Sequence, residues 1–347
     1  MDWNQGSERI IDDGAADARD GEVRWSPVKS LWIGGMSFTA LIFGAMTFSL
    51  GAFALFLVTT AITLCAGHSV GMHRRLIHNS FQCPKGLEYV CVYLGVLVGM
   101  AGPIGMIRQH DLRDWAQRRP KCHDYLRHGR SFWADAWWQL HCELRLTRGP
   151  CFQLEPALEG DRCYFWMERT WMWQQLPWAM AFFAIGGWGW VVWGICARVS
   201  VSVIGHWLVG HFAHRHGPMS WEVRGAGVQG RDVPIAALFS MGESWHNNHH
   251  AFPGSARLGL FPGQWDPGWW LLCGLRRCGL AWSIHTPETL PARPALRRLE
   301  THIADERERR RRNIRTVAPI NSTAIAARPP ITHGELMRNN SGGSGLT

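Results

Sequence analysis

The stretch that decides the fold is Leu31–His73, which reads LWIGGMSFTALIFGAMTFSLGAFALFLVTTAITLCAGHSVGMH and contains no Asp, Glu, Lys or Arg. A helix crosses the hydrocarbon core of a bilayer with about 20 apolar residues. The stretch is therefore long enough for two crossings, and the small residues at Ser49–Gly51 predict the turn between them. We expect a helical hairpin with spans near residues 31–49 and 51–72.

A second long apolar block begins near Trp171 and ends near Val209, and Arg198 interrupts it. This block predicts two further spans, near residues 173–195 and 197–213. Residues 87–107 are also apolar but contain four glycines and Pro103. The pattern as a whole predicts an all-α integral membrane protein with four transmembrane helices.

The ends of the 347-residue chain differ from its apolar middle. Residues 1–28 are rich in Gly, Asp and Ala, which predicts a disordered segment, and they lack the apolar core of a signal peptide. Residues 291–347 carry eleven Arg against five acidic residues and predict a basic, largely flexible tail. Beside so apolar a chain, this charge favours a cytoplasmic, membrane-facing surface over nucleic-acid binding. The ten cysteines form no CxxC pair, which fits reduced thiols.

The 17 histidines are clustered along the chain. His246, His249 and His250 have the spacing i, i+3, i+4, which places three rings on one face of a helix. His73 and His78 form an HxxxxH motif, whose rings would point about 140° apart on a regular α-helix. They can share a metal only if the helix ends or bends between them. Neutral imidazole is the commonest nitrogen ligand for iron and zinc.

Two further groups carry possible ligands. The segment GHWLVGHFAHRHG (205–217) places His206, His211 and His214 at the end of a predicted span, where a histidine is costly and usually functional. In IRQHDLRDWAQR (107–118), His110, Arg113 and Asp114 repeat the i, i+3, i+4 spacing. Only His110 and Asp114 of these three can bind a cation, because arginine keeps its proton.

With these groups the chain resembles the membrane-bound fatty acid desaturases, in particular the acyl-CoA desaturase branch of bacterial type. GMHRRLIHNSF (71–81) is similar to the first histidine box of that family, and GESWHNNHHAFPGSARLGL (242–260) is similar to the last. The resemblance implies one membrane desaturase domain over residues 29–290, with four spans and a cytoplasmic helical cap that carries the boxes. Residues 87–107 are then a half-buried helix, because a crossing there would separate the first two boxes. It also implies that both termini are cytoplasmic, in a bacterial inner membrane.

The resemblance further implies a centre of two non-haem irons with molecular oxygen as co-substrate. The implied ligands are His73, His78, His110, Asp114, His214, His246, His249 and His250. The middle box departs from the family, which has histidines where this chain has Arg113 and Asp114, and Gly210 stands where the family has Asn. His206 and His211 are possible compensating ligands.

The implied reaction is the desaturation of a long-chain acyl substrate, with acyl-CoA as the expected carrier. The chain contains no haem or iron–sulfur motif, so electrons are expected from a separate ferredoxin or cytochrome b5-like protein. The altered middle box leaves two alternatives open. One is a hydroxylation or other oxidation on the same scaffold, and the other is a degenerate metal-binding membrane protein.

Overall fold

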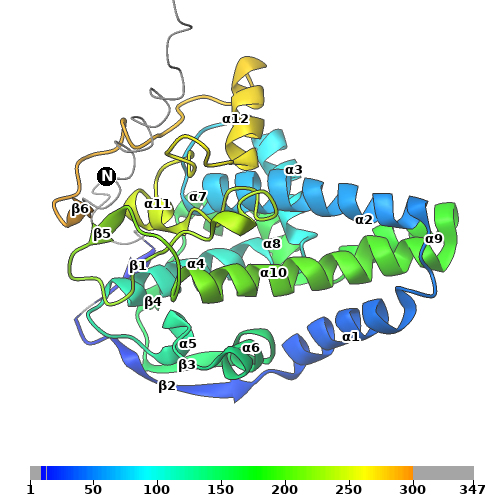
Figure 1. The fold of residues 1–347 in the computed structure, drawn as a ribbon, viewed down its shortest axis with the longest axis horizontal. Coiled ribbons are helices and arrows are strands. Elements are labelled where there is room, and N and C mark those ends of the chain that lie inside the picture. The colour runs from blue at the N-terminus through cyan, green and yellow to red at the C-terminus, as the bar shows by residue number, and fades with distance from the viewer. Residues whose placement is uncertain (1–8, 13, 300–347) are drawn as a thin grey trace, which may run out of the picture. The chain divides into compact units, whose positions relative to one another are not determined.

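The computed structural model describes residues 9–12 and 14–299, and most of them are helical (Figure 1). The apolar helices lie side by side: α2 and α10 pack together, and α1 lies against α10. Their bounds are α1 Pro27–Phe43, α2 Leu50–Ile62, the π-helix η1 Thr63–Ile77, α9 Gln175–Val191, the π-helix η2 Val192–Ala197 and α10 Arg198–Ala213.

Two helical segments are long and apolar enough to cross a membrane. Leu50–Ile77 has 28 residues and a mean hydropathy of 2.0, and Gln175–Ala213 has 39 residues and a mean hydropathy of 1.6. Only 17% and 22% of their most apolar windows are buried inside the protein. Large side chains such as Leu50 and Ile185 are therefore exposed, which suits contact with lipid rather than with water.

The helix boundaries differ from the predicted spans. α1 begins four residues earlier than predicted and ends at Phe43. The turn between α1 and α2 therefore comes before Ser49, and the Ser49 side chain caps the start of α2. In the second apolar block the helix runs unbroken through residues 195–197 and is interrupted at Gly187 instead, where φ is +65°. Only glycine adopts that backbone conformation readily. Apolar composition alone did not reveal this position.

Apart from the apolar α3, which packs on η1, the remaining helices form a polar region around the ends of the apolar ones. They are α3 Lys85–Val96, α4 Pro103–Arg118, α5 Asp124–Arg127, α6 Phe132–His141, α7 Pro156–Glu159, α8 Arg162–Thr170, the 3₁₀-helix η3 Pro234–Ala236, α11 His246–Ala251 and α12 Pro267–Arg277. The single helix predicted over residues 87–107 is two helices, because the chain turns between Val96 and Pro103 through Gly99 at φ +85°.

Three antiparallel two-stranded sheets correct the all-α prediction. β1 (Ile10–Ile11) pairs with β4 (Cys151–Phe152), β2 (Asp17–Trp25) with β3 (Cys142–Arg148), and β5 (Trp221–Val223) with β6 (Leu296–Arg298). They are small and lie in the polar region (Figure 1). Local composition gave no signal for them, because each strand is stabilised by a partner far along the chain.

The predicted disorder of residues 1–28 is also corrected. Ala18 packs on Trp115 and Leu126, and the buried Arg9 pairs with Asp111 at 3.2 Å. This segment has few large apolar residues, but its tertiary contacts order residues 9–12 and 14–28 nonetheless. Of the predicted tail, residues 291–299 contain β6, and the Arg-rich run that follows lies outside the described residues.

Candidate metal centre

Four histidines from three helices meet at one point. His73 lies on η1, His78 follows its last residue, His110 is on α4 and His249 is on α11. One ring nitrogen from each lies within 4.8 Å of the others. The ring centroids of His73 and His249 are 4.6 Å apart, and those of His78 and His110 are 4.7 Å apart. We call this set the four-histidine group.

The π-helix explains how the HxxxxH motif works. In η1 the hydrogen bonds join residues five apart, and the His78 N–H donates to the His73 carbonyl at 3.1 Å. Residues i and i+5 then lie one turn apart, and the two ring centroids are 4.7 Å apart. The sequence prediction required the helix to end or bend between the two residues. The structure meets that requirement with a π-helix that ends at Ile77.

The four rings fit a cation. Two of them present a buried ring nitrogen without a hydrogen bond to the described residues: Nδ1 of His249 and Nε2 of His78. Nδ1 of His73 and Nδ1 of His110 lie beside carboxylates instead, Glu243 at 2.6 Å and Asp111 at 3.6 Å, a contact typical of the outer nitrogen of a metal-binding histidine. Burial holds the pKa of His78 and of His249 well below the ordinary value, so these rings are neutral at pH 7 and keep a lone pair. Unpaired buried acceptors are unfavourable unless something binds them. A metal ion is the partner that this donor set suits.

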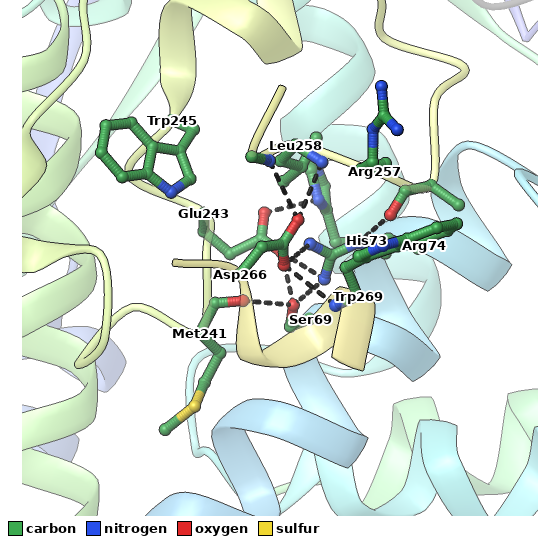
Figure 2. Close-up of polar contacts among 12 residues, drawn as sticks. Ser69, His73, Arg74, Met241, Glu243, Trp245, Arg257, Leu258, Asp266 and Trp269 are labelled. Atoms are coloured by element: carbon green, nitrogen blue, oxygen red, sulfur yellow. Dashed lines mark hydrogen bonds and ion pairs between the residues drawn. The ribbon is translucent and has the colours of Figure 1, made fainter. Parts of the chain in front are cut away.

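A network of charges lies beside the four-histidine group (Figure 2). Glu243 Oε2 is 2.6 Å from Nδ1 of His73, although the direction of the contact is not that of a hydrogen bond. The other Glu243 oxygen pairs with Arg74 at 3.1 Å, and Arg74 pairs with Asp266 at 2.7 Å. Arg74 and Asp266 are almost fully buried, so the network ties the histidine helix firmly to the loops around the last box.

A second group contains His214, His246 and His250, whose ligand nitrogens also lie within 4.8 Å of one another. Their Nε2 atoms converge: His246 Nε2 is 3.1 Å from that of His214 and 3.1 Å from that of His250. We call this set the three-histidine group. It adjoins the four-histidine group, because the ring centroids of His246 and His249 are 5.7 Å apart.

The remaining predicted ligands lie outside both groups. The Asp114 carboxylate is 3.3 Å from Arg118. Burial raises the pKa of Asp114, but the charges of His110 and Arg118 lower this pKa by more, so the net shift is downward and the carboxylate is ionised. The His206 ring centroid is 5.1 Å from that of His68. His211 places its Nδ1 2.8 Å from Asp135.

Arg113 is turned away from the histidine groups into a polar cluster that the sequence did not suggest. Its Nη1 donates to Nε2 of His128 at 2.8 Å, and Nδ1 of His128 lies 2.9 Å from Asp135. The fully buried Asp135 also accepts from Trp207 and His211. Burial, then Arg113, lowers the pKa of His128 to about 4. Asp135 stands alone in its segment of sequence, so no spacing identified it.

Two adjoining groups of imidazoles at the ends of long apolar helices are typical of one class of protein, the membrane-bound metalloenzymes. The chain matches no family model. It is similar to the sn-1 stearoyl-lipid 9-desaturase of Anabaena variabilis, with 31% identity covering 73% of this chain and 93% of that protein. The sn-1 stearoyl-lipid 9-desaturase of Synechocystis is 32% identical over 70% of this chain and 74% of its own length.

A plant protein shows a similar match. The acyl-CoA 5-desaturase of Anemone leveillei is 29% identical over 75% of this chain and 80% of its own length. The chain belongs to the membrane fatty acid desaturases, which are oxidoreductases. Its relatives include both acyl-lipid and acyl-CoA desaturases, so the branch within the family is not resolved.

Proposed function

We propose that this protein introduces a double bond into a saturated long-chain fatty acyl group, carried as acyl-CoA, at a pair of irons held by the two histidine groups. The observation that carries the proposal is the convergence of seven imidazoles in two adjoining groups, in a chain that belongs to this family. Non-haem iron bound there would supply the oxygen-dependent oxidation of an unactivated CH₂ group.

The protein's own residues would position this chemistry. His73, His78, His110 and His249 would hold one iron, and His214, His246 and His250 the other, with Asp114 of α4 as a further candidate. The Arg74–Asp266 pair restrains the loop that follows the last box, so the ligand geometry is formed before any substrate binds.

Electrons and substrate would arrive from outside the chain. We propose a separate ferredoxin or cytochrome b5-like donor on the cytoplasmic side of a bacterial inner membrane. A small surface pocket is lined by His250 of the three-histidine group, by Arg118 and Arg293, and by Asp114. Asp114 pairs with Arg118, so Arg293 is the cation that would favour an anionic group there, such as a CoA headgroup or an acidic donor protein.

The test is the mass of the product. The chain is expressed in a bacterial host with a co-expressed electron donor and fed a saturated fatty acid with a deuterated chain. Loss of two deuteriums, abolished in the His249→Ala variant, is the expected result. Replacement of one deuterium by hydroxyl would instead support the hydroxylase alternative, which the altered middle box motivates. Purified enzyme supplied with acyl-CoA or with phospholipid then identifies the carrier.

A further inference from the structure

We infer that Gln117 is a ligand of the second metal: its side-chain oxygen completes the three-histidine group, where the middle box lacks histidines. This inference rests on the proposed function, because it assumes that the histidine groups bind metal. Gln117 Oε1 lies 3.2 Å from Nε2 of His214, at the point where the Nε2 atoms of His214, His246 and His250 converge.

The hydrogen-bond partners of His214 carry the argument. Nδ1 of His214 is 2.7 Å from the carbonyl oxygen of Gly210, which can only accept, so this nitrogen carries the ring's proton. In that tautomer Nε2 presents a lone pair toward Gln117 Oε1 and does not donate to it.

The orientation of the Gln117 amide is fixed in the same way. Its nitrogen donates to the carbonyl of Leu126 at 2.8 Å, which places the oxygen toward the histidines. The side chain is almost fully buried. Lone pairs of an amide oxygen and an imidazole nitrogen thus face each other at 3.2 Å away from water, an arrangement that a cation between them stabilises.

Helix α4 provides the register for this role. Gln117 follows His110 by seven residues, or about two turns, so both side chains project from the same face. His110 joins the four-histidine group and Gln117 faces the three-histidine group. Asp114 lies on that face too, but its carboxylate pairs with Arg118. Arg113 donates to His128 and to Gln139, so it leaves the space beside His214 to the glutamine.

The experiment counts metals. The full-length chain is purified in detergent without metal and titrated with Co²⁺, with elemental analysis for stoichiometry and visible absorption for the ligand field. We expect two ions per wild-type chain. In Gln117→Leu the affinity of one ion should fall at least tenfold while the other is unchanged, and in Gln117→Glu both ions should bind with a changed absorption spectrum. Gln139→Leu is the matched control, because this glutamine contacts Arg113 and Tyr125 but neither histidine group, and it should bind as wild type.

The outcomes separate the two proposals. Two ions bound with wild-type affinities in Gln117→Leu would overturn the role of Gln117 and leave the proposed function intact. A Gln117→Glu spectrum identical to that of wild type would also overturn it, even if Gln117→Leu failed to fold. A wild-type chain that binds no metal would overturn the proposed function itself.

Discussion

Asp232 shows how one buried carboxyl group is adapted to hold the last histidine box. Its Oδ1 accepts from the backbone N–H of Asn247 at 2.9 Å, next to His246. The Asn247 side chain in turn binds the backbone of Ser220, Trp221 and Gly230. Burial raises the pKa of Asp232 from the ordinary 3.8 to about 7, because the ionised form loses its water. The backbone N–H groups of Asn247 and Asn248 favour the charged form, but they offset only part of its desolvation.

A pH-dependent stability follows for Asp232. The folded protein holds this proton more tightly than the unfolded chain, so the contribution of Asp232 to stability is complete below pH 3.8 and is lost as the pH rises through about 7. Asp232→Asn removes this dependence. We expect wild type and variant to unfold at similar temperatures at pH 4, and the variant to be more stable at pH 8 by on the order of 2–4 kcal/mol. An equal difference in melting temperature at both pH values would contradict this.

A site residue can be predicted from the sequence when residues of the same type recur beside it at a helical spacing. The spacing of His246, His249 and His250 marks a face that binds metal, and the structure brings all three into the two groups. Glu243 and Gln117 act through contacts with residues that lie more than 90 positions away in the chain. A solitary Glu or Gln has no periodic signal, so only the tertiary structure identifies them.

At the scale of elements, the packing of η1 on α3 positions the first histidine box. Gly67 and Gly71 face α3 so closely that an added Cβ would lie 2.4 Å from the backbone of Gly95 and 2.5 Å from that of Cys91. Small residues four apart allow two helices to approach in a membrane, where apolar burial gives little drive. In the sequence these two glycines stand directly before the first histidine box, and their spacing encodes this contact.

The Gly71→Ala variant tests this helix contact. The added methyl group must push η1 away from α3, which we expect to cost about 1–3 kcal/mol of stability and to weaken metal binding at the four-histidine group. The measurements are the melting temperature in detergent and the number of bound Co²⁺ ions. Gly86→Ala is the control, because Gly86 lies on α3 with open space around it. Equal effects of the two substitutions would rule out the close contact.

At the scale of the whole molecule, apolar composition predicted the membrane-embedded character but not the way the polar region is connected. The long segments Leu50–Ile77 and Gln175–Ala213 follow directly from hydropathy. The β-sheets do not, because β2 and β3 are separated by more than 100 residues and pair through backbone groups. Such pairing depends on tertiary proximity more than on residue type.

Labelling of native cysteines tests which parts face the cytoplasm. Cys151 and Cys278 are exposed in the polar region. In variants that keep only one of them, we expect a membrane-impermeant maleimide to react in inside-out vesicles and not in intact spheroplasts. Met46→Cys, in the exposed turn between α1 and α2, should react on the opposite side. Reaction of Cys151 and Cys278 from opposite faces would contradict the single polar face.

The pairing of β2 with β3 also sets an arithmetic rule for the membrane. Backbone hydrogen bonds cannot reach across a bilayer, so both strands occupy one compartment. The chain between Trp25 and Cys142 must therefore cross an even number of times. When α1 and Leu50–Ile77 supply two crossings, α3 adds none, because a third would leave the strands on different sides. This even number does not depend on the histidines. Membrane crossings between the two strands can therefore be gained or lost only in pairs.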